Sequence, residues 1–391
     1  MNRRMLRVLA LTIAGVSVAE VLLLHWAVLA FTGEGVTLGH SLLALACAGA
    51  FNAAAFPQVR RRVRATGLAL VLSRSWIMGS IAALLTGMLL LVALVVIAVG
   101  SALVGNAELG RVVFVWFGGA VIVTGFGTVL WGASVGNYRV VIEEIALPLR
   151  GVTPELSELR IAHVTDLHIG PLLQPERLRG FVRSINRLQA DLIVITGDIF
   201  DFDPSYVEAG CRELGLLEAR LGVYAVLGNH DVYTGAEMIA DAIDRSTSIR
   251  LLRDAWETVD VEGVPLVIAG LDDRGERWTE REAEHEALDR IAAEIPDSLA
   301  CLLLVHRPSY FAHAAKLGFS LLLAGHTHGG QIALPLAHHH NPSRMISRHT
   351  RGVFKRGETT LYVNRGLGMA GLPLRINCPR EIALIRFAEP A

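Results

Sequence analysis

The chain has 391 residues, of which 52% are hydrophobic and 19% are charged. This composition is too apolar for a disordered protein, and the length is too great for one small domain. The net charge of −1 gives no basic stripe of the kind that nucleic-acid-binding domains use. The four cysteines form no Cys-x-x-Cys pair, which argues against a disulfide scaffold and against a cysteine-based zinc site.

Charge is distributed unevenly along the chain. The first 137 residues hold nine arginines and three glutamates, whereas the remaining 254 residues hold 27 basic and 34 acidic residues. The net charge therefore changes from +6 to −7 at this boundary. We predict a transmembrane region over residues 1–135, a connector over residues 136–157 and a soluble domain over residues 158–391.

The first region contains four long apolar stretches, at about residues 6–31, 36–56, 76–100 and 112–133. Each is close to or above the ~20 residues that span a bilayer core. We expect four helices, because lipid offers no hydrogen-bond partners to the backbone and the many glycines suit close helix packing. A cleaved signal peptide is the alternative for the first stretch, but its length and the three spans that follow favour a membrane helix.

The arginines of this region predict how the protein is oriented. Five of them, at positions 60, 61, 62, 64 and 74, lie between the second and third spans, and three more lie near the N-terminus. Such segments face the cytoplasm, so an even number of spans also places the soluble domain on the cytoplasmic side of the inner membrane. Glu20 lies within the first span, where a carboxylate is either a functional group or a hydrogen-bonded packing contact.

The soluble domain has the pattern of an α/β fold, with short apolar runs that alternate with amphipathic segments. The predicted strands are residues 159–165, 191–196, 222–227, 264–269, 300–305, 320–323, 360–363 and 382–385. The predicted helices are residues 176–190, 206–220, 236–245, 279–295 and 308–317.

Five of these strands end in residues of the types that bind metals. They run into Asp166-Leu167-His168, Gly197-Asp198, Gly228-Asn229-His230-Asp231, His306 and Gly325-His326-Thr327-His328. Catalytic groups of α/β sheets gather beyond the carboxyl ends of the strands, so the five clusters can converge. The i, i+2 spacing within two clusters directs both side chains the same way, so that one cluster can offer two ligands.

Carboxylate, amide and imidazole ligands without thiolates suit Mn²⁺, Fe or Zn²⁺ in a hydrolytic site. Two such metals ~3.5–4 Å apart, bridged by a carboxylate, activate water near neutral pH and stabilise the charge on phosphoryl oxygens. This arrangement needs about seven ligands, and the clusters offer seven.

In this order the five clusters resemble the calcineurin-like metallophosphoesterase superfamily over roughly residues 159–387. The stretches 364–368 and 378–382 are similar to its membrane-associated subgroup, transmembrane proteins with a metallophosphoesterase domain. The resemblance implies a four-layer α/β/β/α sandwich and two divalent metal ions, with Mn²⁺ favoured. It also implies that Asp166, His168 and His328 bind one metal, that Asn229, His306 and His326 bind the other, and that Asp198 bridges them. His230 matches the catalytic histidine that protonates or stabilises the leaving oxygen.

Other polar residues near these clusters have simpler interpretations. His163 lies inside the first strand and is expected to be a packed core residue. For Asp201 and Asp203, helix capping and a supporting role at the site remain open. Asp231 either orients a histidine or stabilises a turn. The histidine run 338–340 is expected to be a solvated loop.

The sequence therefore predicts a membrane-anchored, dinuclear metal-dependent phosphoesterase that cleaves phosphodiester or pyrophosphate bonds. Tethering favours substrates confined to the same membrane, such as a lipid-linked phosphate. The resemblance suggests UDP-2,3-diacylglucosamine, because lipid A hydrolases belong to the same superfamily. The alternative is a non-enzymatic membrane sensor that binds metal or nucleotide, but an intact His230 argues against it.

Overall fold

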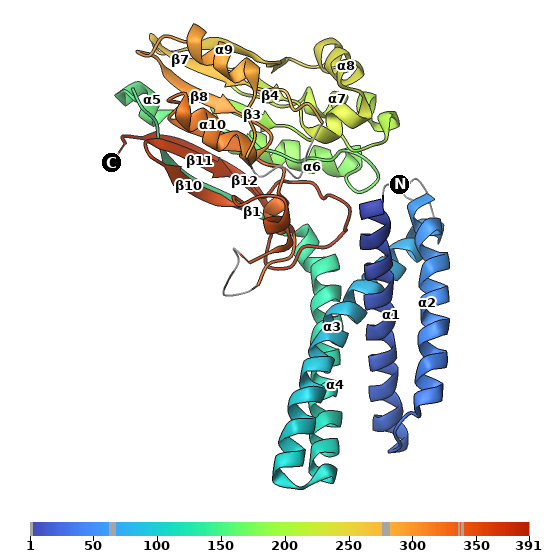
Figure 1. Ribbon diagram of the computed structural model, residues 1–391. Helices are drawn as coiled ribbons and strands as arrows, with labels where there is room; N and C mark the ends of the chain where they lie inside the picture. Colours follow the sequence, from blue (N-terminus) through green and yellow to red (C-terminus); the bar gives the residue numbers. More distant parts are fainter. Residues whose placement is uncertain (1–2, 62–67, 276–281, 335–336, 338–339, 391) are drawn as a thin grey trace. The chain divides into compact units, whose positions relative to one another are not determined.

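The computed structural model describes residues 3–61, 68–275, 282–334, 337 and 340–390 (Figure 1). The chain divides into two compact units, residues 1–134 and residues 135–391. The first is helical, and the second contains both strands and helices.

The helical unit consists of four long helices among the described residues. They are α1 (Arg3–Thr32), α2 (Leu38–Arg61), α3 (Leu68–Val104) and α4 (Ala107–Trp131). All four are long and apolar enough to cross a membrane, over residues 10–32, 38–55, 72–104 and 107–136. The prediction of four apolar N-terminal helices is confirmed.

Small and polar residues allow these helices to pack closely. A side-chain carbon added at Gly87 of α3 would lie 2.5 Å from the Cβ of Ala19 in α1, so only glycine fits this contact. The buried Asn52 of α2 donates through its Nδ2 to Glu20 of α1 at 2.8 Å and to Ser17 of α1 at 3.1 Å. Glu20 therefore makes the hydrogen-bonded packing contact that was the simpler of its two interpretations.

The second unit contains two six-stranded sheets within the described residues, in the orders β1-β12-β2-β3-β4-β5 and β10-β11-β9-β8-β7-β6. The strands of the first sheet are β1 (Val140–Pro148), β2 (Ile161–Val164), β3 (Leu192–Thr196), β4 (Val223–Val226), β5 (Ile249–Leu251) and β12 (Arg380–Ala388). The strands of the second sheet are β6 (Ala255–Val261), β7 (Val264–Gly270), β8 (Ala300–Leu304), β9 (Leu321–Ala324), β10 (Gly352–Arg356) and β11 (Thr359–Val363).

Helices cover the outer faces of both sheets, as Figure 1 shows for α9 and α10 beside β7 and β8. The α-helices are α5 (Pro154–Glu158), α6 (Pro175–Asn186), α7 (Val207–Leu214), α8 (Asn229–Ser246), α9 (Glu286–Glu294) and α10 (Phe311–Lys316). One apolar cluster joins α6, α7 and α8 to the first sheet, a second joins the two sheets, and a third joins α9 and α10 to the second sheet. The predicted α/β/β/α sandwich is confirmed.

The structure corrects the predicted connector. Residues 136–157 contain β1, which pairs in parallel with β12, and the short helix α5. Three further strands, β5, β6 and β10, were also not predicted. All four missed strands lie at sheet edges, where one side of the strand lacks a neighbour and many side chains are exposed. The run of apolar residues by which a strand is predicted is therefore weak in these edge strands.

The bounds of the predicted helices also differ from those in the structure. The helix predicted over residues 206–220 extends only from Val207 to Leu214. The helix predicted over residues 279–295 is observed from Glu286 to Glu294, and residues 279–281 lie outside the described residues. By contrast, α8 begins earlier than predicted, at Asn229, and bends at Gly235, whose φ is 131°.

Candidate metal centre

Side chains from both sheets meet beyond the carboxyl ends of the parallel strands. β2, β3 and β4 are parallel to one another in the first sheet, and β8 and β9 are parallel in the second. The eight predicted site residues follow these five strands. They are Asp166 and His168 after β2, Asp198 after β3, Asn229 and His230 after β4, His306 after β8, and His326 and His328 after β9. The structure brings all eight together.

Strained backbone is concentrated in these turns. Asp166, His168, Asp198, His326 and His328 have φ values between 47° and 70°, a range that residues other than glycine rarely adopt. Each costs of order 1–3 kcal/mol, so the surrounding structure must hold it. The N–H of Asp166 donates to the Gly197 carbonyl at 3.0 Å, and the N–H of His168 donates to the Asp198 carbonyl at 2.9 Å. Strain gathered in this way indicates a functional site.

One group of potential ligands contains Asp166, His168 and His328, whose ligand atoms all lie within 4.8 Å of one another. The Nε2 atoms of His168 and His328 are 3.0 Å apart, and His328 Nε2 lies 3.3 Å from Asp166 Oδ1. All three side chains are buried. Two imidazoles and one carboxylate that converge on one point are ligands that suit Mn²⁺, Fe or Zn²⁺.

A second group contains Asp198, His306 and His326. His306 Nε2 lies 3.2 Å from Asp198 Oδ2 and 3.1 Å from His326 Nδ1. The other ring nitrogen of His306 donates to the Thr196 carbonyl at 2.8 Å, which directs Nε2 towards the group. Asp198 Oδ2 is also 3.5 Å from His168 Nε2, so this carboxylate faces both groups. That is the position a bridging ligand requires.

Asn229 adds an oxygen to this region. Its side chain is 3% exposed, and its Oδ1 has no hydrogen-bond partner in the described part of the chain. Buried acceptors are rarely left without a partner, because the desolvation cost is not recovered. Asn229 lines the same cavity as Asp198 and His326, so a cation there would satisfy this oxygen.

Burial and neighbouring charges determine which imidazoles are protonated. Burial, followed by the charge of His306, lowers the pKa of His326 to about 4. Burial also lowers the pKa of His328 well below its usual range. For His306, burial opposes the charged form, but the charge of Asp198 outweighs it and raises the pKa to about 10. Burial likewise acts to raise the pKa of Asp198, but the charge of His306 holds it well below its usual range.

These observations together test whether the site fits metal ions. His326 and His328 are neutral and offer lone pairs, Asn229 has an unsatisfied oxygen, and Asp198 is ionised against a protonated His306. A cation can replace the proton of His306, because metal binding releases protons from its ligands. The donor set therefore fits two divalent metals, and ligation by these seven residues remains a prediction.

His230 lies on the wall of the cavity beside these groups. Its Nδ1 is 3.1 Å from Asp201 Oδ1, which leaves Nε2 for a substrate. Its backbone N–H donates to Asp198 Oδ1 at 2.8 Å, so the start of α8 is hydrogen-bonded to the Asp198 carboxylate. Asp201 thus has the supporting role that the sequence left open, whereas Asp203 caps a turn by accepting from the N–H of Ser205.

Asp231 supports the site through hydrogen bonds to backbone N–H groups. Its carboxylate accepts from the backbone N–H groups of Ile199 at 3.1 Å, Phe200 at 2.8 Å and Gly228 at 2.8 Å. These bonds join the turn after β3 to the turn after β4, which is the turn-stabilising role. His163 is fully buried, and its Nε2 is 2.8 Å from Thr196 Oγ1, as expected of a packed core residue. His338 and His339 lie outside the described residues.

The segment after β11 packs against the turn that carries Asp166. The N–H of Gly368 donates to the Asp166 carbonyl at 2.6 Å, and a Cβ at Gly368 would lie 2.0 Å from the Leu167 carbonyl oxygen. Arg375, which is 1% exposed, donates to the carbonyls of Arg365 at 2.9 Å and Gly368 at 2.8 Å. Arg375 is not among the predicted site residues. Its position between two stretches of the subgroup pattern was the available signal.

The cavity at the candidate metal centre has a volume of about 530 Å³. Asp198, Asn229, His230, His326 and His328 form its polar part. Apolar and aromatic side chains form another part of the lining. They are Phe202, Tyr233, Ile332, Ile346 and Leu372. The cavity therefore offers an apolar surface beside the candidate metal ligands.

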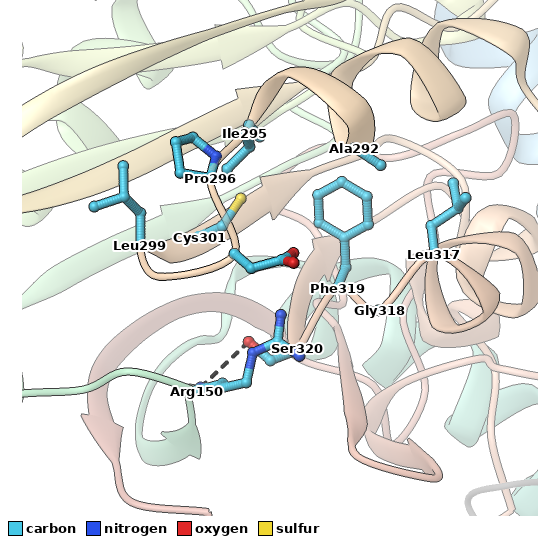
Figure 2. Close-up of a pocket in the computed structure, with 11 residues that line it drawn as sticks. Arg150, Ala292, Ile295, Pro296, Leu299, Cys301, Leu317, Gly318, Phe319 and Ser320 are labelled. Atoms are coloured by element: carbon cyan, nitrogen blue, oxygen red, sulfur yellow. Dashed lines mark hydrogen bonds between the residues drawn. The ribbon is translucent and has the colours of Figure 1, made fainter.

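A much smaller crevice lies at the opposite ends of the same strands (Figure 2). It has a volume of about 30 Å³ and is lined by Cys301 and Ser320 at the starts of β8 and β9. The N–H of Arg150 donates to Ser320 Oγ at 3.3 Å. Burial raises the pKa of the Cys301 thiol to about 12, so this thiol is unreactive near neutral pH.

Comparison with known proteins identifies a family and several related proteins. Residues 159–330 match a family model described as calcineurin-like phosphoesterase. A protein of Bos taurus named "Transmembrane protein with metallophosphoesterase domain" is 29% identical over 259 residues, which cover 64% of this chain and only 57% of the bovine protein. The "Uncharacterized metallophosphoesterase YkuE" of Bacillus subtilis is 32% identical over 228 residues, which cover 58% of this chain and 77% of YkuE. The crystal structure of TT1561 of Thermus thermophilus matches with a TM-score of 0.36 and 16% identity, over 54% of this chain and 90% of that one.

Proposed function

Because this chain belongs to the calcineurin-like metallophosphoesterase family, we propose that it is a membrane-anchored phosphoesterase that uses two divalent metal ions. The observation that carries the proposal is the convergence of two groups of ligand-type side chains on Asp198. Asp166, His168 and His328 would hold one metal, and Asn229, His306 and His326 the other. When bound, such ions activate water and stabilise negative charge on a phosphoryl group.

The residues of the chain supply the remaining parts of the reaction. His230 is placed to donate a proton from Nε2 to the leaving oxygen, because Asp201 holds its Nδ1. Asp231 and the strained turns fix the positions of Asp198 and His230 before a substrate binds. A rigid arrangement of this kind lowers the cost of reorganisation during the reaction.

We propose that the substrate is a lipid-linked phosphodiester or pyrophosphate. Two observations support this class. Phe202, Tyr233 and Leu372 give the cavity an apolar surface beside His230, where a lipid or other apolar group can lie. The four N-terminal helices are long and apolar enough to cross a membrane, and a site tethered in this way would have a raised effective concentration towards substrates in the same membrane.

The direct test is turnover by the full-length protein in detergent, first depleted of metal with EDTA and then loaded with Mn²⁺. The panel contains a nitrophenyl phosphodiester, a phosphomonoester and UDP-2,3-diacylglucosamine. We expect metal-dependent hydrolysis of the diester and the lipid pyrophosphate. Turnover of none of the three by protein that binds two metals would contradict the phosphoesterase assignment and favour a sensor. Turnover of the soluble substrates alone would contradict only the lipid class.

We also propose that the second unit faces the cytoplasm, as the arginines between α2 and α3 predict. Two of these, Arg62 and Arg64, lie outside the described residues. A reporter fused after residue 391 should be active only in the cytoplasm, and replacement of Arg60, Arg61, Arg62 and Arg64 by glutamine should weaken or reverse that result. An exported reporter on the unaltered chain would overturn the orientation.

A further inference from the structure

Arg380, the first residue of β12, is fully buried and has no carboxylate partner in the described part of the chain. Its exposed fraction is 0%, its Nε and Nη2 donate to the carbonyl and the side-chain oxygen of Asn137 at 2.6 and 2.8 Å, and its Nη1 has no partner among the described residues. Burial, followed by the positive charges of Arg375 and Arg177, lowers its pKa to about 8. A buried guanidinium usually has an anion beside it, because its desolvation is otherwise not compensated.

Arg177 of α6 brings a second positive charge to the same place. Its Nη2 donates to the Asn137 carbonyl at 3.2 Å, so both guanidinium groups share one acceptor. Both also lie within 6 Å of the centre of the Phe181 ring, at 5.8 Å for Arg177 and 5.6 Å for Arg380. Arg177 is half-buried and lies 4.3 Å from the centre of the exposed Tyr138 ring, so solvent reaches this arginine.

Among the described residues, no carboxylate balances these charges. In the described part of the chain, neither Arg177 nor Arg380 forms an ion pair. The hydrogen-bond acceptor that the two arginines share belongs to the neutral Asn137. Two like charges that share one neutral acceptor repel each other, and an anion beside the half-buried Arg177 would offset this repulsion. The planar guanidinium group matches the oxygens of a phosphate particularly well.

Chain connectivity places these residues at the membrane surface. Asn137 directly follows residue 136, the last residue of the fourth candidate span. That span has 30 residues and, as a helix, is about 45 Å long, which exceeds the ~30 Å of the hydrocarbon core and extends into the headgroup layer. Tyrosine residues such as Tyr138 are enriched at the interface between membrane and water. An anion at Arg177 would therefore be drawn from the headgroup layer.

We propose that Arg177, aided by the positive charge of the buried Arg380 nearby, binds the phosphate of an anionic lipid headgroup at a site separate from the candidate metal centre. The site uses lipid as a ligand and not as a substrate. It fixes the start of β1 and the start of α6 to the membrane surface through Asn137. Anionic lipids are enriched in the cytoplasmic leaflet, where the second unit is proposed to lie.

The test is the thermal unfolding midpoint of the full-length protein in detergent micelles, with phosphatidylglycerol, phosphatidylcholine or inorganic phosphate added at equal concentrations. We expect phosphatidylglycerol to raise the midpoint by about 3 °C or more relative to phosphatidylcholine, because a ligand bound only by the folded state stabilises it. Arg177→Gln should abolish this difference, and Arg177→Lys should keep part of it. Arg183→Gln, an exposed arginine of the same helix, is the matched control and should keep all of it.

The variant Asp198→Asn tests whether this site is separate from the candidate metal centre. Phosphatidylglycerol should raise the unfolding midpoint of this variant as much as that of the unaltered protein. Loss of the response in this variant would place the lipid at the metal centre and overturn the proposal. An unchanged response in Arg177→Gln, or equal responses to the two lipids, would overturn it as well. An equal response to inorganic phosphate, lost in Arg177→Gln, would show that the site binds free phosphate and overturn the assignment to lipid.

Discussion

The two ends of β8 and β9 differ sharply although they belong to the same strands. Their carboxyl ends lead into His306 and His326, beside a cavity of about 530 Å³. Their amino ends carry Cys301 and Ser320, beside a crevice of about 30 Å³ (Figure 2). Parallel strands bring the turns at their carboxyl ends together, and these turns are the place where side chains from several strands can converge. Strand direction, and not burial alone, therefore determines where the candidate metal ligands converge.

The largest expected effect comes from the carboxylate that faces both groups of ligands. Asp198→Asn should lose at least one metal and nearly all activity, because a neutral amide cannot offset two closely spaced cations. Metal content by elemental analysis and turnover of a diester measure both effects. Asp297→Asn, the same change at the exposed aspartate of the amino-end crevice, should leave both unchanged. Two metals and substantial turnover in Asp198→Asn would refute the bridging role.

A smaller loss is expected at His230, the proposed proton donor. His230→Ala should keep both metals and lose ~10²–10⁴-fold in kcat, the usual range for general acid catalysis. The loss should shrink for a nitrophenyl leaving group, which needs little protonation, and grow for a sugar or lipid hydroxyl. Equal losses on both substrates would instead assign His230 to electrostatic stabilisation of the phosphoryl oxygens.

Gly368 tests how the segment after β11 supports the carboxyl-end turns. Gly368→Ala puts a methyl group 2.0 Å from the Leu167 carbonyl oxygen, so we expect a loss of about 1–3 kcal/mol in unfolding free energy together with weaker metal binding. Denaturant unfolding and metal titration measure these effects. Gly180→Ala in α6 is the control, because no atom lies within 4 Å of the added carbon. Unchanged metal affinity in a destabilised Gly368→Ala would limit this segment to a structural role.

The smallest expected effect concerns His163, which lies inside a strand and not at a strand end. Burial lowers the pKa of His163 from 6.5 to about 3, so the folded protein keeps it neutral where the unfolded chain binds a proton. Stability from this group is therefore present above pH 6.5 and is lost as the pH falls towards 3. Between pH 7.5 and 5.5, the difference in unfolding free energy between the unaltered protein and His163→Gln should change by about 1 kcal/mol. A difference independent of pH would contradict the neutral buried state.

The site residues could be predicted because their signals are local. Asp166-x-His168 and His326-x-His328 each follow an apolar run, so both the ligand type and its place at a strand end are visible in a few residues. The supporting residues lack such signals. Asp231 stabilises backbone groups 31 and 32 residues away, and Arg375 binds carbonyls of a segment that only the fold brings to Asp166.

The same distinction between local and distant contacts explains which strands could be predicted from the sequence. Interior strands such as β3 and β9 are fully buried and appear as apolar runs, because both faces contact the core. The edge strand β1 has mostly exposed or half-buried residues, and its pairing with β12 joins positions about 240 residues apart. Its sequence resembles a connector, since the features that make it a strand are contributed by its partner.

The amino-acid sequence by itself determined the four apolar helices, the alternation of strands and helices in the second unit and the residues that meet at the carboxyl ends of the strands. These follow from apolar periodicity and from side-chain chemistry at strand ends, which depend on neighbouring residues in the chain. Only the tertiary structure decided the edge strands, the role of Asp201 beside His230 and the pairing of Arg177 with Arg380 at Asn137. These depend on contacts between segments far apart in the chain, and a local pattern does not encode which distant segment supplies the partner.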